Sequence, residues 1–226
     1  RQEVRIFTKT EAINRPTYAE YPMGKPLDRS GSSGYPHLFT PYGKKGDFLE
    51  FNDKQETWYF KKNVEAQRVS SKIDDVINKA KQDSIYIHPF VAYCKDEVVK
   101  LSKIYDVNSA KTRIFFSGTM EYLVAYRMYF GAAMQRIMEN FGELPPKIGI
   151  SADGIDWNNL AHRLTAKSQD NCIATDVKNY DSSIHRAFIS SVPLVYDAIY
   201  NRCGNPAMDT AEATAIRANL HRSVES

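Results

Sequence analysis

The sequence predicts an α/β fold of the α+β type, with long helices, a few short strands and no internal repeat. Apolar residues recur at spacings of three and four in several long stretches, which is typical of helices. Two β-rich runs, at 85–94 and 114–116, flank a charged segment, and a third short apolar run ends at Asp176. The 226 residues, of which 42% are hydrophobic and 25% charged, are enough to bury a sizeable core.

Composition also excludes several classes of protein. The three cysteines (Cys94, Cys172 and Cys203) are far apart and form no C-x-x-C pair, which argues against a zinc site or disulfide framework and fits a reducing compartment. No apolar run approaches membrane-spanning length, and the N-terminus lacks a signal-peptide pattern. The net charge of +3 is too small to indicate a nucleic-acid partner by itself. Because the chain begins at Arg1 rather than Met, we expect it to be a segment of a longer polypeptide.

The first half of the chain predicts an irregular segment followed by a helix and two strands. Residues 1–50 are rich in proline and glycine but also carry many aromatic residues, which indicates a packed, loop-rich segment. A helix is predicted from about 54 to 82, where Val69, Ile73 and Val76 recur at helical spacing. The runs 85–94 and 114–116 are predicted strands, joined through a turn at 106–109.

The second half predicts mostly helices. Thr119 is expected to cap a long helix that ends near residue 141, before two prolines, and Asp156 is expected to cap a short helix. A strand is predicted at 171–176, followed by helices at about 183–202 and 209–222. Pro193 is expected to bend the first of these or to mark its early turn.

Asp176 and Asp181 are the first candidate site. Two carboxylates close to the end of a strand can hold Mg²⁺, which prefers oxygen ligands and often shares its coordination with substrate phosphates. The alternative is structural: Asp181 would cap the helix that follows, and Asp176 would be a solvated loop acid.

A basic hairpin is the second candidate site. Lysines at 95, 100, 103 and 111 and the arginine at 113 surround Glu97, which is available to pair with them. Fixed cations between two strands suit phosphate binding or base stacking. The alternative is a solvated surface hairpin in which Glu97 and Asp106 partly neutralise the lysines.

A run of small residues at 30–36, followed by Lys44 and Lys45, is the third candidate site. Small residues let the backbone approach a ligand closely, and backbone N–H groups can bind phosphate oxygens. The alternative is a flexible surface turn. The glycine patterns of P-loop and Rossmann proteins do not occur, and none of the five histidines shows a metal-ligand spacing.

Taken in order, these segments resemble the RNA-dependent RNA polymerases of picorna-like positive-strand RNA viruses. Residues 27–36 and 43–49 are similar to motif G and its surroundings, and residues 95–113 to motif F. Residues 127–131 match the helix that follows motif F, and residues 175–181 resemble motif A. The resemblance covers nearly the whole chain in the family's order.

The resemblance implies a right-hand polymerase of which this chain holds the fingers (1–129) and the N-terminal part of an RRM-like palm (130–226). The implied activity is template-directed RNA synthesis in viral genome replication, in which nucleoside triphosphates are joined with release of pyrophosphate. Motifs B and C, including the Gly-Asp-Asp of motif C, would lie beyond Ser226. We therefore expect residues 1–226 to be inactive alone.

The resemblance also implies a role for each matching residue. Asp176 and the backbone carbonyl of Val177 would bind Mg²⁺, or Mn²⁺ in its place, and Asp181 would recognise the ribose 2′-hydroxyl of the nucleotide. Asp176, Arg113 and Lys103 would be catalytic. The nucleotide path would be lined by Lys95, Lys103 and Arg113, with Glu97 orienting Arg113. The template channel would be bordered by Ser32, Ser33, Gly34, Tyr35 and Pro36.

The implied partners are template and product RNA, nucleoside triphosphates and other viral replication proteins. The implied location is the host cell cytoplasm, at membrane-associated replication complexes. Two alternatives remain. Another right-hand polymerase, such as a reverse transcriptase, would lack the basic hairpin in this form. A non-catalytic RNA-binding module would keep its RNA affinity after Asp176→Ala.

Overall fold

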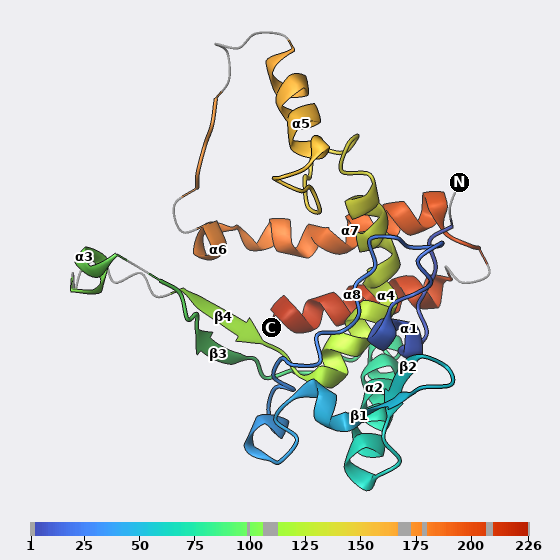
Figure 1. Ribbon diagram of the computed structural model, residues 1–226. Helices are drawn as coiled ribbons and strands as arrows, with labels where there is room; N and C mark the ends of the chain where they lie inside the picture. Colours follow the sequence, from blue (N-terminus) through green and yellow to red (C-terminus); the bar gives the residue numbers. More distant parts are fainter. Residues whose placement is uncertain are drawn as a thin grey trace.

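The computed structural model describes residues 3–98, 100–105, 113–166, 173–177, 180–206 and 210–225. Four long helices form its body (Figure 1), and α4 packs against each of the other three. These helices are α2 (Val64–Lys81), α4 (Met120–Glu139), α7 (Arg186–Cys203) and α8 (Ala211–Glu225). The core contains buried apolar side chains from all four. The mixed α+β composition agrees with the prediction.

The N-terminal segment is irregular but packed, as predicted. It contains α1 (Lys9–Asn14), whose N-cap Thr8 forms a reciprocal capping box, and two short 3₁₀ helices, η1 (His37–Phe39) and η2 (Lys45–Phe48). Tyr21 is fully buried within this segment. The segment therefore contributes to the core although it has little regular structure.

The helix predicted at 54–82 is correct only from residue 64. Residues 49–60 instead form an antiparallel hairpin of β1 (Leu49–Asn52) and β2 (Thr57–Phe60). Phe51 pairs with Trp58 across this hairpin. The helix begins where the Asn63 side chain accepts a hydrogen bond from the N–H of Ala66. The residues that carry the helical pattern, Val69, Ile73 and Val76, all lie in α2, and cross-strand aromatic pairing stabilises the hairpin before it.

The basic hairpin contains the second pair of strands. β3 (Val91–Cys94) and β4 (Ile114–Ser117) are antiparallel, with Tyr93 opposite Phe115. The predicted run 85–94 is a strand only over its last four residues. Pro89 has no N–H to donate to a ladder, which accounts for the late start of the strand. The short helix α3 (Leu101–Ile104) lies between the strands, and the predicted turn at 106–109 lies outside the described residues.

The long helix α4 begins as predicted, because the Thr119 hydroxyl accepts from the N–H of Tyr122. The short helix α5 (Ile155–Thr165) is also present, but its N-cap is Gly154 and not Asp156. Asp156 lies in the first turn, where an acid still interacts favourably with the helix dipole. The predicted division into fingers and palm falls inside α4, which runs continuously across residue 129.

The strand predicted at 171–176 is not found in its described part, residues 173–176. Strand backbone needs a hydrogen-bonding partner, and among the described strands β1 pairs with β2 and β3 with β4. The two helices predicted after it are confirmed as α7 and α8, preceded by the short α6 (Tyr180–Ser183). Among the described residues, no helix combines the length and the apolar character that crossing a membrane requires.

Pro193 lies in the interior of α7 and not in its early turn. A proline there leaves the carbonyl four residues earlier, that of Ile189, without a partner inside the helix. The Nε2 atom of His221, from α8, lies 2.8 Å from this carbonyl oxygen and donates to it. The neighbouring helix therefore compensates for the proline.

Candidate functional site

Two of the three predicted sites lie against each other. We define the small-residue loop as residues 30–36 and the basic hairpin as residues 91–117. The Ser32 hydroxyl lies 3.2 Å from the hydroxyl of Tyr93 in β3, and the Tyr93 ring stacks on Phe115 at a centroid distance of 5.5 Å. Sequence analysis did not single out Tyr93. Only the strand register, which places Tyr93 opposite Phe115, could have drawn attention to it.

The small-residue loop is held in a fixed conformation. The Ser33 carbonyl accepts from the N–H of Met120 at 2.9 Å, and the Ser33 hydroxyl donates to the Tyr42 carbonyl at 2.7 Å. Gly34 has a φ of +81°, and a Cβ there would lie 2.4 Å from the Gly118 carbonyl oxygen. Only glycine fits this backbone conformation and this close approach.

The five residues predicted to border the template therefore divide into two groups. Ser33 and Gly34 are buried and support the loop, whereas Tyr35 and Pro36 are exposed and Ser32 is half-buried. Tyr35 packs edge-on against Phe39, with ring centroids 6.2 Å apart. Of these five residues, Tyr35 and Pro36 are therefore the most accessible to a ligand, and Ser32 is partly so.

Lys45 supports the small-residue loop from the protein interior. Its N–H donates to the Gly31 carbonyl at 3.1 Å, and its side chain is buried. Burial lowers the pKa of the Lys45 ammonium, although the nearby Asp28 carboxylate acts in the opposite direction. Lys45 is therefore a packing residue, whereas Lys44 lies nearer the surface and its backbone forms a bridge with Ser32.

The cations of the basic hairpin gather around Glu97. The N–H of Lys95 donates to the Arg113 carbonyl at 2.8 Å, which extends the strand ladder by one pair. Glu97 then contacts both side chains, with its Oε1 atom 3.3 Å from Arg113 Nε and its Oε2 atom 3.6 Å from Lys95 Nζ. The Arg113 side chain remains 72% exposed. Glu97 thus holds one edge of the guanidinium and leaves most of it accessible to an anion.

Lys103 lies in α3, at the far end of the basic hairpin in Figure 1. Its backbone is helical, and its side chain lies outside what the structure describes. Lys100, the residue before this helix, is exposed.

The remaining predicted site, around Asp176, is an exposed extended segment. Asp176 and Val177 precede α6, on the side of the molecule toward which the basic hairpin projects (Figure 1). Within the described ranges, no hydrogen bond or ion pair joins Asp176 to the basic hairpin. Asp181 is the second residue of α6, and the N-cap of α7 is His185 rather than Asp181.

The donor set at Asp176 fits part of a magnesium site. A carboxylate and a backbone carbonyl supply the oxygen ligands that Mg²⁺ prefers, but octahedral coordination needs several more. No group of three or more His, Cys, Asp or Glu side chains suited to a metal occurs in the described part of the chain. Asp176 and the Val177 carbonyl could therefore supply at most two of the ligands that such an ion requires.

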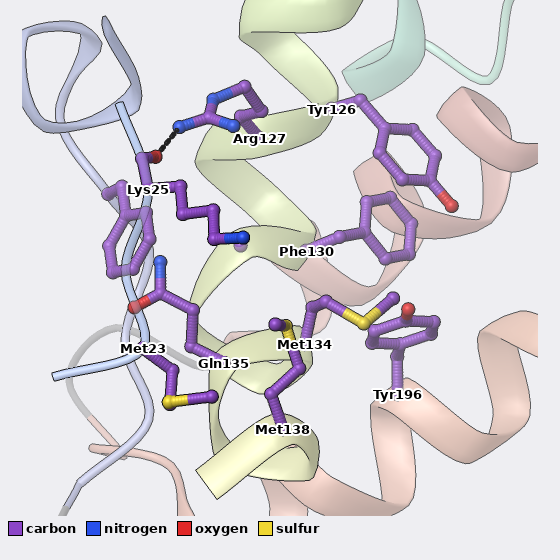
Figure 2. Close-up of a pocket in the computed structure, with 11 residues that line it drawn as sticks. Met23, Lys25, Tyr126, Arg127, Phe130, Met134, Gln135, Met138 and Tyr196 are labelled. Carbon is purple, nitrogen blue, oxygen red and sulfur yellow. Dashed lines mark hydrogen bonds between the residues drawn. The ribbon is translucent and has the colours of Figure 1, made fainter. Parts of the chain in front are cut away.

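An apolar cavity of about 200 Å³ lies elsewhere, beside the C-terminal half of α4 (Figure 2). Its wall includes Met134 and Met138 of α4, Tyr196 of α7 and Met23 of the N-terminal segment. Arg127 at its edge donates to the carbonyls of Ala12 and Lys25, so its guanidinium is used to hold the N-terminal segment. The cavity lies away from the N-terminal end of α4, where the small-residue loop packs.

Comparison with known proteins identifies the family. The family model described as viral RNA-dependent RNA polymerase matches residues 1–221. The chain belongs to this family. The family resemblance and the fold class inferred from the ordered motifs are thereby confirmed.

Individual relatives agree with this assignment. The chain is 28% identical to the replicase polyprotein of Drosophila C virus over 182 residues, which are 80% of this chain and 10% of that polyprotein. It is also 28% identical to the replicase polyprotein of Cricket paralysis virus over 179 residues, again 10% of the relative. The chain thus spans about a tenth of these polyproteins.

A solved structure shows the same fold. The Sicinivirus 3Dpol RNA-dependent RNA polymerase superposes with a TM-score of 0.69 at 17% sequence identity. The match covers 96% of this chain and 40% of that polymerase.

Proposed function

We propose that the protein to which this chain belongs synthesises RNA on an RNA template, joining nucleoside triphosphates with release of pyrophosphate during viral genome replication. The observation that carries the proposal is the contact between Ser32 and Tyr93, since it joins the small-residue loop to the basic hairpin. A template strand guided by the loop would then lie beside cations suited to a triphosphate. Relatives named as replicase polyproteins and as a replication polyprotein support this proposal.

The cations of the basic hairpin would bind the triphosphate. Arg113 offers a planar, largely exposed guanidinium that can pair with two phosphate oxygens, and Glu97 keeps it in place. Lys95 and Lys103 would add positive charge along the same path. In phosphoryl-type transfer the protein contributes chiefly positioning and charge stabilisation, which matches this arrangement.

Asp176 and the Val177 carbonyl would hold Mg²⁺, or Mn²⁺ in its place, and Asp181 would recognise the ribose 2′-hydroxyl. When bound, a pair of such ions activates the primer 3′-hydroxyl and stabilises the leaving pyrophosphate. Among the chain's own residues, Arg113 of the basic hairpin would orient the nucleotide. Tyr35 and Pro36 would guide the template strand. We further propose that the polymerase works with other viral replication proteins at membrane-associated complexes in the host cytoplasm.

Primer extension by the polymerase polypeptide that contains this chain and its downstream motifs tests the proposal. Asp176→Ala should lower nucleotide incorporation by about 10²–10³-fold, and Arg113→Ala should raise the KM for the nucleotide more than Arg113→Lys does. RNA affinity should be retained in all three variants. A parent protein that binds RNA without incorporating nucleotides would contradict the proposal, and one that prefers deoxynucleotides would indicate a reverse transcriptase.

A further inference from the structure

We propose that His37 and Glu121 form a buried positioning pair that fixes the small-residue loop against the start of α4 and thereby sets the affinity for template RNA. The proposal rests on the proposed function and assigns it a positioning device outside the predicted motifs. Neither residue touches the reacting atoms. Their effect on the template would be indirect, through the exposed residues Tyr35 and Pro36.

The two side chains meet inside the protein. His37 directly follows Pro36, and Glu121 lies in the first turn of α4, 84 residues further along the chain. The Nε2 atom of His37 lies 2.8 Å from the Oε1 atom of Glu121, and the two residues are only 8% and 5% exposed. The His37 ring also packs edge-on against Phe48, with centroids 5.1 Å apart.

Glu121 is ionised at neutral pH. Burial raises the pKa of its carboxyl, but the hydrogen bond from His37, the Glu121 N–H and the nearby Lys72 ammonium together hold the pKa below its ordinary value. The N-terminus of α4 also favours a negative charge at this position. An ionised carboxylate only accepts hydrogen bonds, so the Nε2 atom of His37 carries the proton and donates.

The pair lies where the basic hairpin and the small-residue loop meet the helix. β4 ends at Ser117, and Gly118 packs against Gly34 closely enough to exclude any side chain there. Thr119 caps α4, and its hydroxyl lies 3.3 Å from the Nδ1 atom of His88. The same short stretch therefore anchors both candidate site elements, and the His37–Glu121 hydrogen bond ties the end of the small-residue loop to α4.

A small cavity adjoins the pair. It measures about 160 Å³ and is bounded by Tyr35 and Pro36 on the loop side and by Lys72 and Glu121 on the helix side. The second oxygen of Glu121 is buried and has no hydrogen-bond partner among the described residues. An apolar pair would fill this space at lower desolvation cost, so the contribution specific to His37 and Glu121 is a directional hydrogen bond.

The test measures template binding and kinetics in the full polymerase polypeptide. Glu121→Ala and His37→Phe should each weaken the binding of template RNA about tenfold and raise the KM for template, with kcat changed less than about twofold. Glu121→Gln should stay close to wild type, since its amide oxygen can still accept from His37. The double variant should be no worse than either single variant.

Glu139→Ala is the matched control, because Glu139 forms a similar, largely buried ion pair with Arg136 at the opposite end of α4. It should leave template affinity unchanged. The proposal is overturned if Glu121→Ala and Glu139→Ala weaken template binding equally, or if Glu121→Ala lowers only the melting temperature. RNA binding is measured by fluorescence anisotropy without nucleotides. A protein that fails to incorporate nucleotides would refute the proposed function, but the anisotropy measurement would still show whether His37 and Glu121 affect template affinity.

Discussion

His88 is a buried histidine whose surroundings strongly favour its neutral form. Its ring lies between those of Tyr86 and Tyr122, with centroid distances of 4.5 and 4.3 Å. Burial lowers the pKa of His88 to about 4, although the Glu121 carboxylate acts in the opposite direction. In the unfolded chain the pKa returns to about 6.5, so the unfolded state binds the proton more readily below that value.

The free energy of unfolding should therefore fall as the pH decreases from about 6.5 to 4, with a contribution from His88 on the order of 3 kcal/mol. Substituting His88→Phe should remove this part of the pH dependence while keeping the aromatic packing. Denaturant unfolding at pH 7 and pH 4.5 measures it. An unchanged difference between the two pH values in the variant would contradict this explanation.

Gly34 is the glycine at which backbone and packing leave the least freedom. Gly34→Ala should reduce the free energy of unfolding by about 1–3 kcal/mol, because the new Cβ would meet the Gly118 carbonyl at a positive φ. Gly142→Ala is the control, since a Cβ at Gly142 would have no neighbour within 4 Å. Urea titration compares the two variants, and equal stabilities would show that the loop can move away from Gly118.

For single residues, the sequence predicted which residues belong to a candidate site better than it predicted which of their side chains are exposed. Glu97 was expected to pair with the surrounding cations, and the family resemblance implied Arg113 as the residue it orients; the contact with Arg113 is present. The run of small residues around Ser33 and Gly34 was recognised, but both residues are buried and only their neighbours are exposed. Side-chain direction depends on Gly118 and Met120, which come from a distant part of the chain. No local pattern contains that information.

The interior proline of α7 gives a test at the level of helices. His221→Ala should destabilise the protein by about 1–3 kcal/mol, since the Ile189 carbonyl loses the donor that replaces the missing proline N–H. In a Pro193→Ala background the loss should be smaller, because the residue at 193 can then donate to Ile189 within the helix. A double-mutant cycle of unfolding free energies measures the coupling. Additive effects would contradict the compensation.

The start of α4 was predicted correctly from sequence, whereas the starts of α2 and α5 were not. The Thr119 cap determined the start of α4 because the signal is local. The hairpin β1–β2 was missed because its stability depends on cross-strand pairs such as Phe51 with Trp58. The spacing of residues along the sequence does not show which residues pair across strands. The strand prediction at 171–176 was wrong over the described residues 173–176 for a related reason, because a strand requires a partner that periodicity does not supply.

At the scale of the whole molecule, large apolar side chains remain exposed on α5 and α7. They include Trp157 on α5, which has no buried residue, and Phe188 and Leu194 on α7. The chain covers 40% of the Sicinivirus polymerase to which it is similar.

Residues 1–226 alone should show no nucleotide incorporation with Mg²⁺ or Mn²⁺. The physical reason is that Asp176 and the Val177 carbonyl would supply only two of the several oxygen ligands that an octahedral ion requires. Primer extension with the isolated chain, beside the longer polypeptide as positive control, measures this. Metal-dependent synthesis by residues 1–226 would overturn the prediction.

The N-terminal segment is attached to a part of the fold that is synthesised much later. The N–H of Val4 donates to the Cys203 carbonyl at 2.8 Å, and the N–H of Asn205 donates back to the Val4 carbonyl at 3.3 Å. At roughly 5–20 residues per second, a ribosome needs on the order of 10–40 s to reach Cys203 after Val4. During that interval the backbone of Val4 lacks its final partners, so this contact closes only after nearly the whole described chain has been translated.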